Sequence, residues 1–107
     1  DQNHLLSSTS IIQLMEYAPD INRFLVPEVP FSQVKNTLIH YRTFDQNATE
    51  IFRLTEKPAS VLVNQRPIPE NDSTDQEYWN WKPMENGGML IIRHRNGKYI
   101  SVIRDLS

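Results

Sequence analysis

The chain has no cysteine among its 107 residues. That absence excludes disulfides, thiolate nucleophiles and thiolate-bound metal ions. Glycine is scarce as well, with three residues at positions 87, 88 and 97, so no glycine-rich loop can enclose a phosphate. An excess of positive charge is also missing, because 11 Lys and Arg residues against 13 Asp and Glu residues give a net charge of −2. We therefore expect no nucleic-acid partner, since such proteins need a basic excess or a basic face.

Long apolar runs are missing too. No stretch approaches the roughly 20 apolar residues that cross a bilayer, so we expect no membrane span. The first residues, DQNHLL, have neither the basic head nor the apolar centre of a signal peptide. Any such peptide would have to be missing from the chain already.

The first third of the chain, residues 1–33, predicts a helical or extended lead-in that packs on the rest of the chain or on a neighbouring domain. The polar run at 7–10 offers helix N-caps, and Ile11 and Met15 lie four residues apart. Pro19 follows and would end the helix. The sequence therefore predicts one short helix near residues 10–18.

From Val34 onward apolar residues recur at every second position, which is the periodicity of a β-strand. Strands are expected at about 37–44, 50–55, 59–63, 66–68, 78–81, 89–95 and 98–104. Several short strands separated by turns indicate an all-β fold. We predict an antiparallel two-sheet β-sandwich of immunoglobulin-like type over residues 34–107.

Two dipeptides predict tight turns. Asn64-Gln65 fits a two-residue hairpin loop, although Gln65 replaces the glycine that is usual there. Asn96-Gly97 is a strong hairpin signal and predicts a type I′ turn that places His94 opposite Tyr99. Pro83 is expected to end the strand that begins at residue 78.

Candidate catalytic acids are few. A glycosidase needs two carboxyl groups about 5–10 Å apart, and the sequence offers Asp45 with Glu50 or Glu77 with Glu85. Each pair lies in or beside a predicted turn, and no apolar pocket is evident that would raise the pKa of one member. Solvated turn carboxylates are the favoured interpretation.

The three histidines, His4, His40 and His94, are far apart in the sequence and lack the spacing of metal ligands on a helix. No G-x-S-x-G element is present for a nucleophilic serine. We therefore predict that the chain is not an enzyme and has no catalytic residue, no metal site and no cofactor.

The tryptophans suggest a binding site. Trp79 and Trp81 are two residues apart, so on a strand both project from one face. Flat aromatic rings can pack on the apolar faces of sugar rings, and Asn80 offers an amide for hydroxyl groups. The candidate saccharide-binding set is Trp79, Asn80 and Trp81. The favoured interpretation is that both rings fill the core or dock on an adjoining domain.

The last two predicted strands are basic, with Arg93, Arg95, Lys98 and Arg104. A nucleic-acid face is one interpretation of this pattern. A solvated strand edge that resists aggregation is favoured, since no nucleic-acid-binding motif accompanies the charges.

The segments IHYRTFDQNATEIFRLTEKPASVLVNQRPI and YWNWKPMENGGMLIIRHRNGKYISV resemble the C-terminal β-sandwich accessory domains of bacterial polysaccharide-degrading glycoside hydrolases. The shared features are the KPASVLVN strand, the W-x-W strand and the closing pair of strands after GG and NG. In that family the strand reads V-x-V-N-G, whereas this chain has Gln65 in place of the glycine. The resemblance covers about residues 34–104.

The resemblance implies a non-catalytic accessory module, structural or weakly saccharide-binding, in the periplasm or outside the cell. Its partner would be an adjoining catalytic domain of the same polypeptide, and polysaccharide where it binds one. No catalytic residues carry over, because the family places them in the other domain.

An independent protein–protein interaction domain or adhesin-like envelope domain is the alternative function. Exposed rings at Trp79 and Trp81 would favour saccharide contact. Buried tryptophans with an apolar patch around Phe24, Leu25 and Phe31 would favour docking to a protein.

Overall fold

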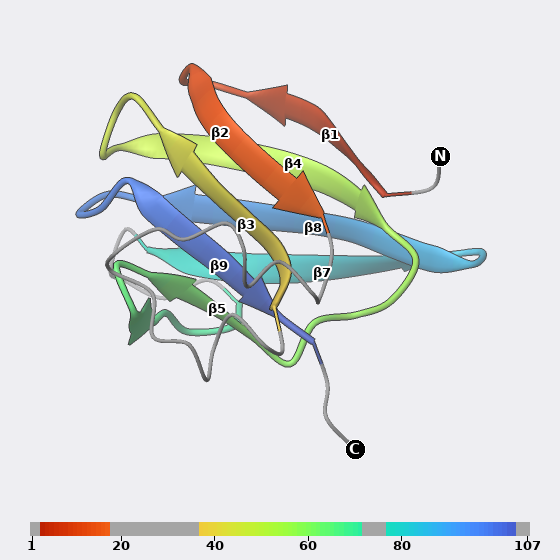
Figure 1. Cartoon of the computed structure of the whole chain (residues 1–107). Coiled ribbons are helices and arrows are strands. Elements are labelled where there is room, and N and C mark those ends of the chain that lie inside the picture. The colour runs from red at the N-terminus through yellow and green to blue at the C-terminus, as the bar shows by residue number, and fades with distance from the viewer. Residues whose placement is uncertain (1–2, 18–36, 72–76, 105–107) are drawn as a thin grey trace.

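The computed structural model describes residues 3–17, 37–71 and 77–104, and these form two antiparallel sheets that pack face to face (Figure 1). The four-stranded sheet has the order β1-β4-β8-β7, and the five-stranded sheet has the order β2-β3-β9-β5-β6. The strands are β1 (His4–Ser8), β2 (Ile12–Tyr17), β3 (Thr37–Thr43), β4 (Ala48–Leu54), β5 (Ser60–Val63), β6 (Arg66–Pro67), β7 (Tyr78–Met84), β8 (Gly87–His94) and β9 (Tyr99–Ile103). The predicted all-β fold of two antiparallel sheets is confirmed.

The core lies between the sheets and follows the two-residue periodicity of the sequence. The β4 strand alternates buried and half-buried residues along its whole length, and so does β8. Tyr41 from one sheet packs on Phe52 from the other, with ring centroids 5.1 Å apart. The other fully buried apolar side chains are Ile39, Leu54, Val61, Val63, Leu90, Ile92, Ile100 and Val102.

The helix predicted near residues 10–18 is wrong, because residues 12–17 form β2 and pair with β3. Ile11, which the helix prediction paired with Met15, is 66% exposed, and the register instead shifts by one residue at a β-bulge between Ile12 and Leu14. Ile12 and Met15, three residues apart, therefore both pack against the core. A strand with one bulge thus places apolar side chains three residues apart on one face, as a helix does. The β1 strand has a similar shift between Leu5 and Ser7.

The predicted hairpin around Asn96-Gly97 is also wrong. The two flanking strands lie in different sheets, since β8 pairs with β4 and β7 whereas β9 pairs with β3 and β5. Neither Asn96 nor Gly97 has a positive φ, which a type I′ turn requires at both positions. The segment 95–98 therefore crosses from one sheet to the other.

The Asn64-Gln65 turn is confirmed. Val63 pairs with Arg66, and the two residues between them have φ of 49° and 68°, as in a type I′ turn. Pro83 does not end its strand as expected, because β7 continues to Met84. The β7 strand lies at the edge of its sheet, where proline is tolerated.

The β1 and β2 strands join the sheets at their outer edges, where β1 pairs with β4 and β2 pairs with β3. The apolar patch expected around Phe24, Leu25 and Phe31 lies outside the described residues. In the described parts of the chain there is no helix long and apolar enough to cross a membrane.

Candidate functional site

The tryptophan strand places its two rings on the inner face of the four-stranded sheet. Trp79 is only 2% exposed and belongs to the core. Trp81 is half-buried and packs against that core, where a Cβ added at Gly88 would lie 2.6 Å from its indole ring. Asn80, also half-buried, projects from the opposite face. Of the two interpretations of the tryptophans, the core interpretation is therefore right for Trp79, and its ring has no free face for a sugar.

A polar cluster joins the two sheets inside the sandwich. The Glu50 carboxylate accepts hydrogen bonds from the Tyr41 hydroxyl at 2.7 Å and from Ser8 Oγ at 3.0 Å, and its Oε1 lies 2.8 Å from His94 Nε2. The side chains of Glu50 and His94 have no exposed surface. Tyr41 lies on β3 and Glu50 on β4, so the Tyr41–Glu50 hydrogen bond crosses between the sheets.

The His94 ring is held on both sides. Its Nδ1 lies 2.8 Å from the carbonyl oxygen of Gln46 and 2.9 Å from that of Gly97, so this nitrogen carries a proton. The Nε2 atom faces Glu50, and an imidazolium can donate from both nitrogens. Burial lowers the pKa of His94, but the hydrogen bond and negative charge of Glu50, with the two carbonyls, outweigh it and raise the pKa above 6.5.

A second buried carboxylate fixes the segment that crosses between the sheets. Glu77 Oε2 accepts the backbone N–H groups of Arg95 and Asn96 at 2.9 and 2.8 Å, and Arg66 donates to Oε1 at 3.1 Å. Burial raises the pKa of Glu77, but the two N–H donors and Arg66 outweigh it and hold the pKa below 4.5. This carboxylate therefore stabilises the backbone conformation that replaces the expected hairpin.

The candidate carboxylate pair Glu77 and Glu85 is not brought together. Glu77 precedes β7 and Glu85 follows it, so roughly 25 Å of extended strand separates them. That separation is well beyond the reach of a glycosidase pair. Asp45 is exposed and accepts from Ser10 Oγ at 2.9 Å, whereas Glu50 is buried in the cluster described above.

The histidines are equally dispersed. His4 is exposed on β1, and His40 is buried with its Nδ1 atom 3.0 Å from Ser101 Oγ. Within the described ranges, no group of three or more His, Cys, Asp or Glu side chains could hold a metal ion.

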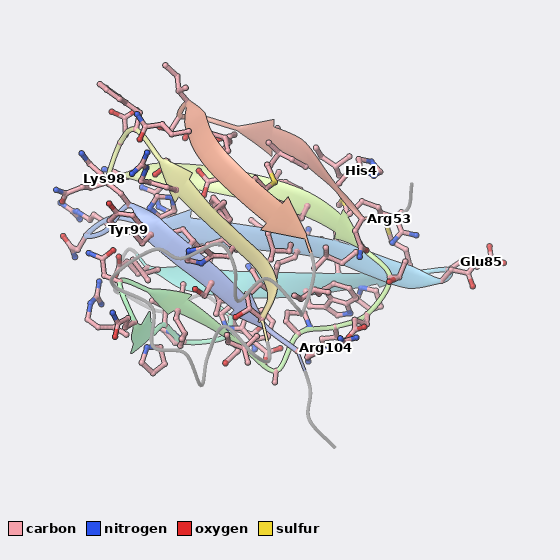
Figure 2. The ribbon with its side chains drawn as sticks, in the orientation of Figure 1. His4, Arg53, Glu85, Lys98, Tyr99 and Arg104 are labelled. Carbon is pink, nitrogen blue, oxygen red and sulfur yellow. The ribbon has the colours of Figure 1, made fainter. Side chains whose placement is uncertain are left out.

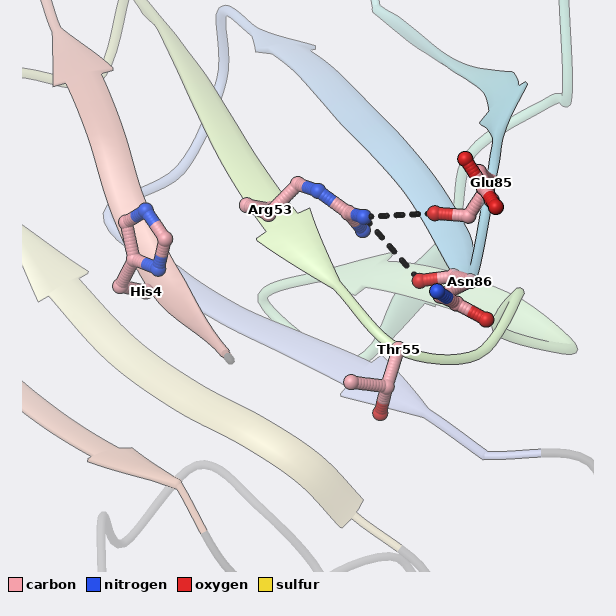
Figure 3. A pocket seen from close by; sticks show the side chains of 5 residues that line it. All are labelled: His4, Arg53, Thr55, Glu85 and Asn86. Atoms are coloured by element: carbon pink, nitrogen blue, oxygen red, sulfur yellow. Dashed lines mark hydrogen bonds between the residues drawn. The ribbon is translucent and has the colours of Figure 1, made fainter. Parts of the chain in front are cut away.

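A half-open pocket of about 590 Å³ lies at the end of the sandwich near the β7–β8 turn (Figure 3). Its lining residues are His4, Arg53, Thr55, Glu85 and Asn86. The Arg53 guanidinium donates at 2.7–3.1 Å to four carbonyl oxygens, those of Leu54, Gly88, Glu85 and Asn86. Because most of its donors are used in holding this turn, Arg53 has little left to offer a ligand.

Sequence reasoning missed the Glu50–His94 cluster, although a signal was present. Glu50 shares the alternating face of Phe52 and Leu54, and His94 shares that of Leu90 and Ile92. A charged residue at an apolar position of a strand indicates a buried charge with a partner.

Comparison with known proteins gives no relative. No family model matches the chain, and neither a curated protein nor a solved structure matches it. The resemblance to accessory domains of glycoside hydrolases therefore stays a prediction.

Proposed function

We propose that the chain is a non-catalytic accessory module of a secreted bacterial carbohydrate-active protein, with an immunoglobulin-like sandwich fold. Its partner is an adjoining catalytic domain of the same polypeptide, and its role is structural or weakly saccharide-binding. The proposal places the protein in the periplasm or outside the cell.

The observation that carries the proposal is the use made of the reactive side chains. Internal hydrogen bonds that hold the two sheets and the crossing segment in place engage the side chains of Glu50, Glu77 and His94. Catalytic acids need a partner across a substrate-sized gap, and these groups face protein atoms instead. Their arrangement is that of a rigid scaffold.

The burial of Trp79 favours the structural part of the proposal over a tryptophan platform. A buried tryptophan contributes a large apolar area to the core, and Trp81 extends that core toward the edge of the sheet. Saccharide contact then needs another surface of the module.

Truncation of the parent protein tests the proposal. The parent reading frame is expected to encode a glycoside hydrolase catalytic domain, and removing residues 1–107 should lower the melting temperature of that domain. A surface variant of the module, Lys57→Ala, serves as the control, because it leaves the sandwich intact. A parent without a catalytic domain, or one whose catalytic domain melts unchanged after the truncation, would contradict an accessory role.

A further inference from the structure

Three connections meet at one end of the sandwich. These are residues 9–11 between β1 and β2, residues 44–47 between β3 and β4, and residues 95–98 between β8 and β9. Backbone hydrogen bonds tie them together: Phe44 N–H donates to the Ile11 carbonyl at 2.8 Å, and Thr43 N–H donates to the Lys98 carbonyl at 2.9 Å. Figure 2 shows Lys98 and Tyr99 at this end and Glu85 at the opposite end.

Two large apolar side chains are exposed here. Phe44 is 55% exposed and Ile11 is 66% exposed, and the hydrogen bond between their backbones makes them neighbours. Neither belongs to the core between the sheets. An aromatic ring and an aliphatic side chain side by side in solvent form a small apolar surface that a ligand can cover.

Cations lie at the same end of the sandwich as this apolar pair. Lys98 Nζ lies 6.0 Å from the centroid of the Phe44 ring, and the Arg42 guanidinium lies 5.8 Å from that of Tyr99. Arg42, Arg95 and Lys98 form no ion pair with a described residue, since the ion pairs found join Lys57 to Glu70, Arg66 to Glu77, His94 to Glu50 and Arg104 to Glu56.

The local charge opposes that of the whole chain. Residues 9–11, 42–47 and 93–99, together with Arg66 and Glu77 that bind the backbone of residues 95 and 96, carry five cations, Arg42, Arg66, Arg93, Arg95 and Lys98, against Asp45 and Glu77, whereas the full chain has a net charge of −2. Asp45 accepts a hydrogen bond from Ser10 Oγ. His94 lies beneath this surface and is paired with Glu50. The excess of cations at this end of the sandwich therefore favours an anionic ligand.

We propose that this surface, formed by Ile11, Arg42, Phe44 and Lys98, binds an anionic saccharide. A sugar ring packs on Phe44, and Lys98 and Arg42 pair with a carboxylate or a sulfate ester of the sugar. Gln46 and Asn47, exposed in the same loop as Phe44, supply amide donors and acceptors for hydroxyl groups. A sugar presents a flat apolar face to the Phe44 ring and hydroxyl groups to these amides, so we choose the saccharide over an acidic peptide, and the glutamate peptide in the titration tests that choice. The inference rests on the proposed function, because it identifies the saccharide that the module binds.

Calorimetric titration of the full chain tests the proposal. The ligands are an oligogalacturonide, a sulfated oligosaccharide, a neutral malto-oligosaccharide and a glutamate peptide matched in charge. One of the two anionic sugars should bind, more weakly as salt rises, and the neutral sugar should not. Phe44→Ala and Lys98→Glu should each weaken binding about tenfold.

Lys82→Glu is the matched control, because it makes the same change in net charge at an exposed position of β7. We expect it to alter the affinity by about twofold at most, since a remote exposed charge is screened by salt. Far-ultraviolet circular dichroism would show that each variant keeps its sheets.

Absence of binding to both anionic sugars would overturn the saccharide site, as would equal affinity for the glutamate peptide or an equal loss in Lys82→Glu. The truncation test of the accessory role does not depend on any of these titrations. If no sugar binds but the truncation lowers the melting temperature of the catalytic domain, the saccharide site is refuted and the accessory role stands.

Discussion

Removing the Glu50 carboxylate should destabilise the sandwich more than any exposed substitution. The Glu50→Ala change leaves His94 without its Nε2 partner and leaves the Tyr41 hydroxyl without its acceptor, both in the interior. Removing one partner of a buried ion pair costs about 3–5 kcal/mol of unfolding free energy. That is a large part of the roughly 5–15 kcal/mol of stability typical of a domain.

Urea unfolding followed by tryptophan fluorescence would measure this cost, because the buried Trp79 reports on the core. The isosteric variant Glu50→Gln is the matched comparison. Its amide fills the same space and can donate to a neutral His94, so we expect a smaller loss of about 1–2 kcal/mol. A loss below about 1 kcal/mol for Glu50→Ala would refute the interpretation of the cluster as a link between the sheets.

The pH dependence gives a second measure of the same cluster. The pKa of His94 is raised above its unfolded value of 6.5, so the stabilisation is complete below pH 6.5 and is lost as pH rises through the folded pKa. The unfolding free energy should therefore fall with rising pH above 6.5, by at most about 1.4 kcal/mol per pH unit for one proton. Glu50→Gln should remove this decline. A wild-type stability that rises over the same range would contradict the assigned protonation.

Three further changes test other parts of the structure. Gln65→Gly should raise the unfolding free energy by about 0.5–1 kcal/mol. Glycine removes the strain of a side chain at positive φ, and this gain exceeds the entropy that glycine adds to the unfolded chain. A lower unfolding free energy in urea would contradict the turn. Glu77→Gln should cost about 1–3 kcal/mol near neutral pH. It should also weaken the acid-induced loss of stability, which in wild type begins near pH 4.5 and continues as pH falls through the lowered pKa of Glu77. An acid transition that is the same in wild type and variant would contradict the role of the Glu77 carboxylate. Trp79→Ala should cost about 3–5 kcal/mol, and an unchanged melting temperature would show that the ring is not part of the core.

The sequence predicted the elements whose pattern is local. Alternating apolar residues in β3, β4, β5 and β8 predicted strands, and these strands line the core. The Asn64-Gln65 turn also followed from local chemistry, since asparagine tolerates a positive φ.

The remaining features depend on contacts between distant segments. The bulge in β2 is set by pairing with β3 and reproduces helical spacing at Ile12 and Met15. The segment Asn96-Gly97 crosses between the sheets, and its backbone is held there by Glu77, about twenty residues earlier in the chain, which accepts the N–H groups of residues 95 and 96. Neither the bulge nor the Glu77 contact can be recognised from the sequence around it alone.

The candidate site was predictable only in part. The sequence correctly placed Trp79 and Trp81 on one face of a strand, but that face turned out to be the inner one. Which face of a two-sided strand is covered depends on the second sheet. The exposed pair Ile11 and Phe44 has no local signal at all, because the two residues meet only through the folded loops.

The most direct test of the central claim is an assay for product release by the purified chain. The chain would be incubated with a panel of neutral, uronate-containing and sulfated polysaccharides between about pH 4 and 8, the range in which paired carboxylic acids work. Reducing ends would be measured against a buffer blank. Because Glu50 and Glu77 are engaged within the fold, the account predicts no release above the blank on any substrate. Release that disappears in a Glu85→Gln or Asp45→Asn variant would contradict it and identify an enzyme.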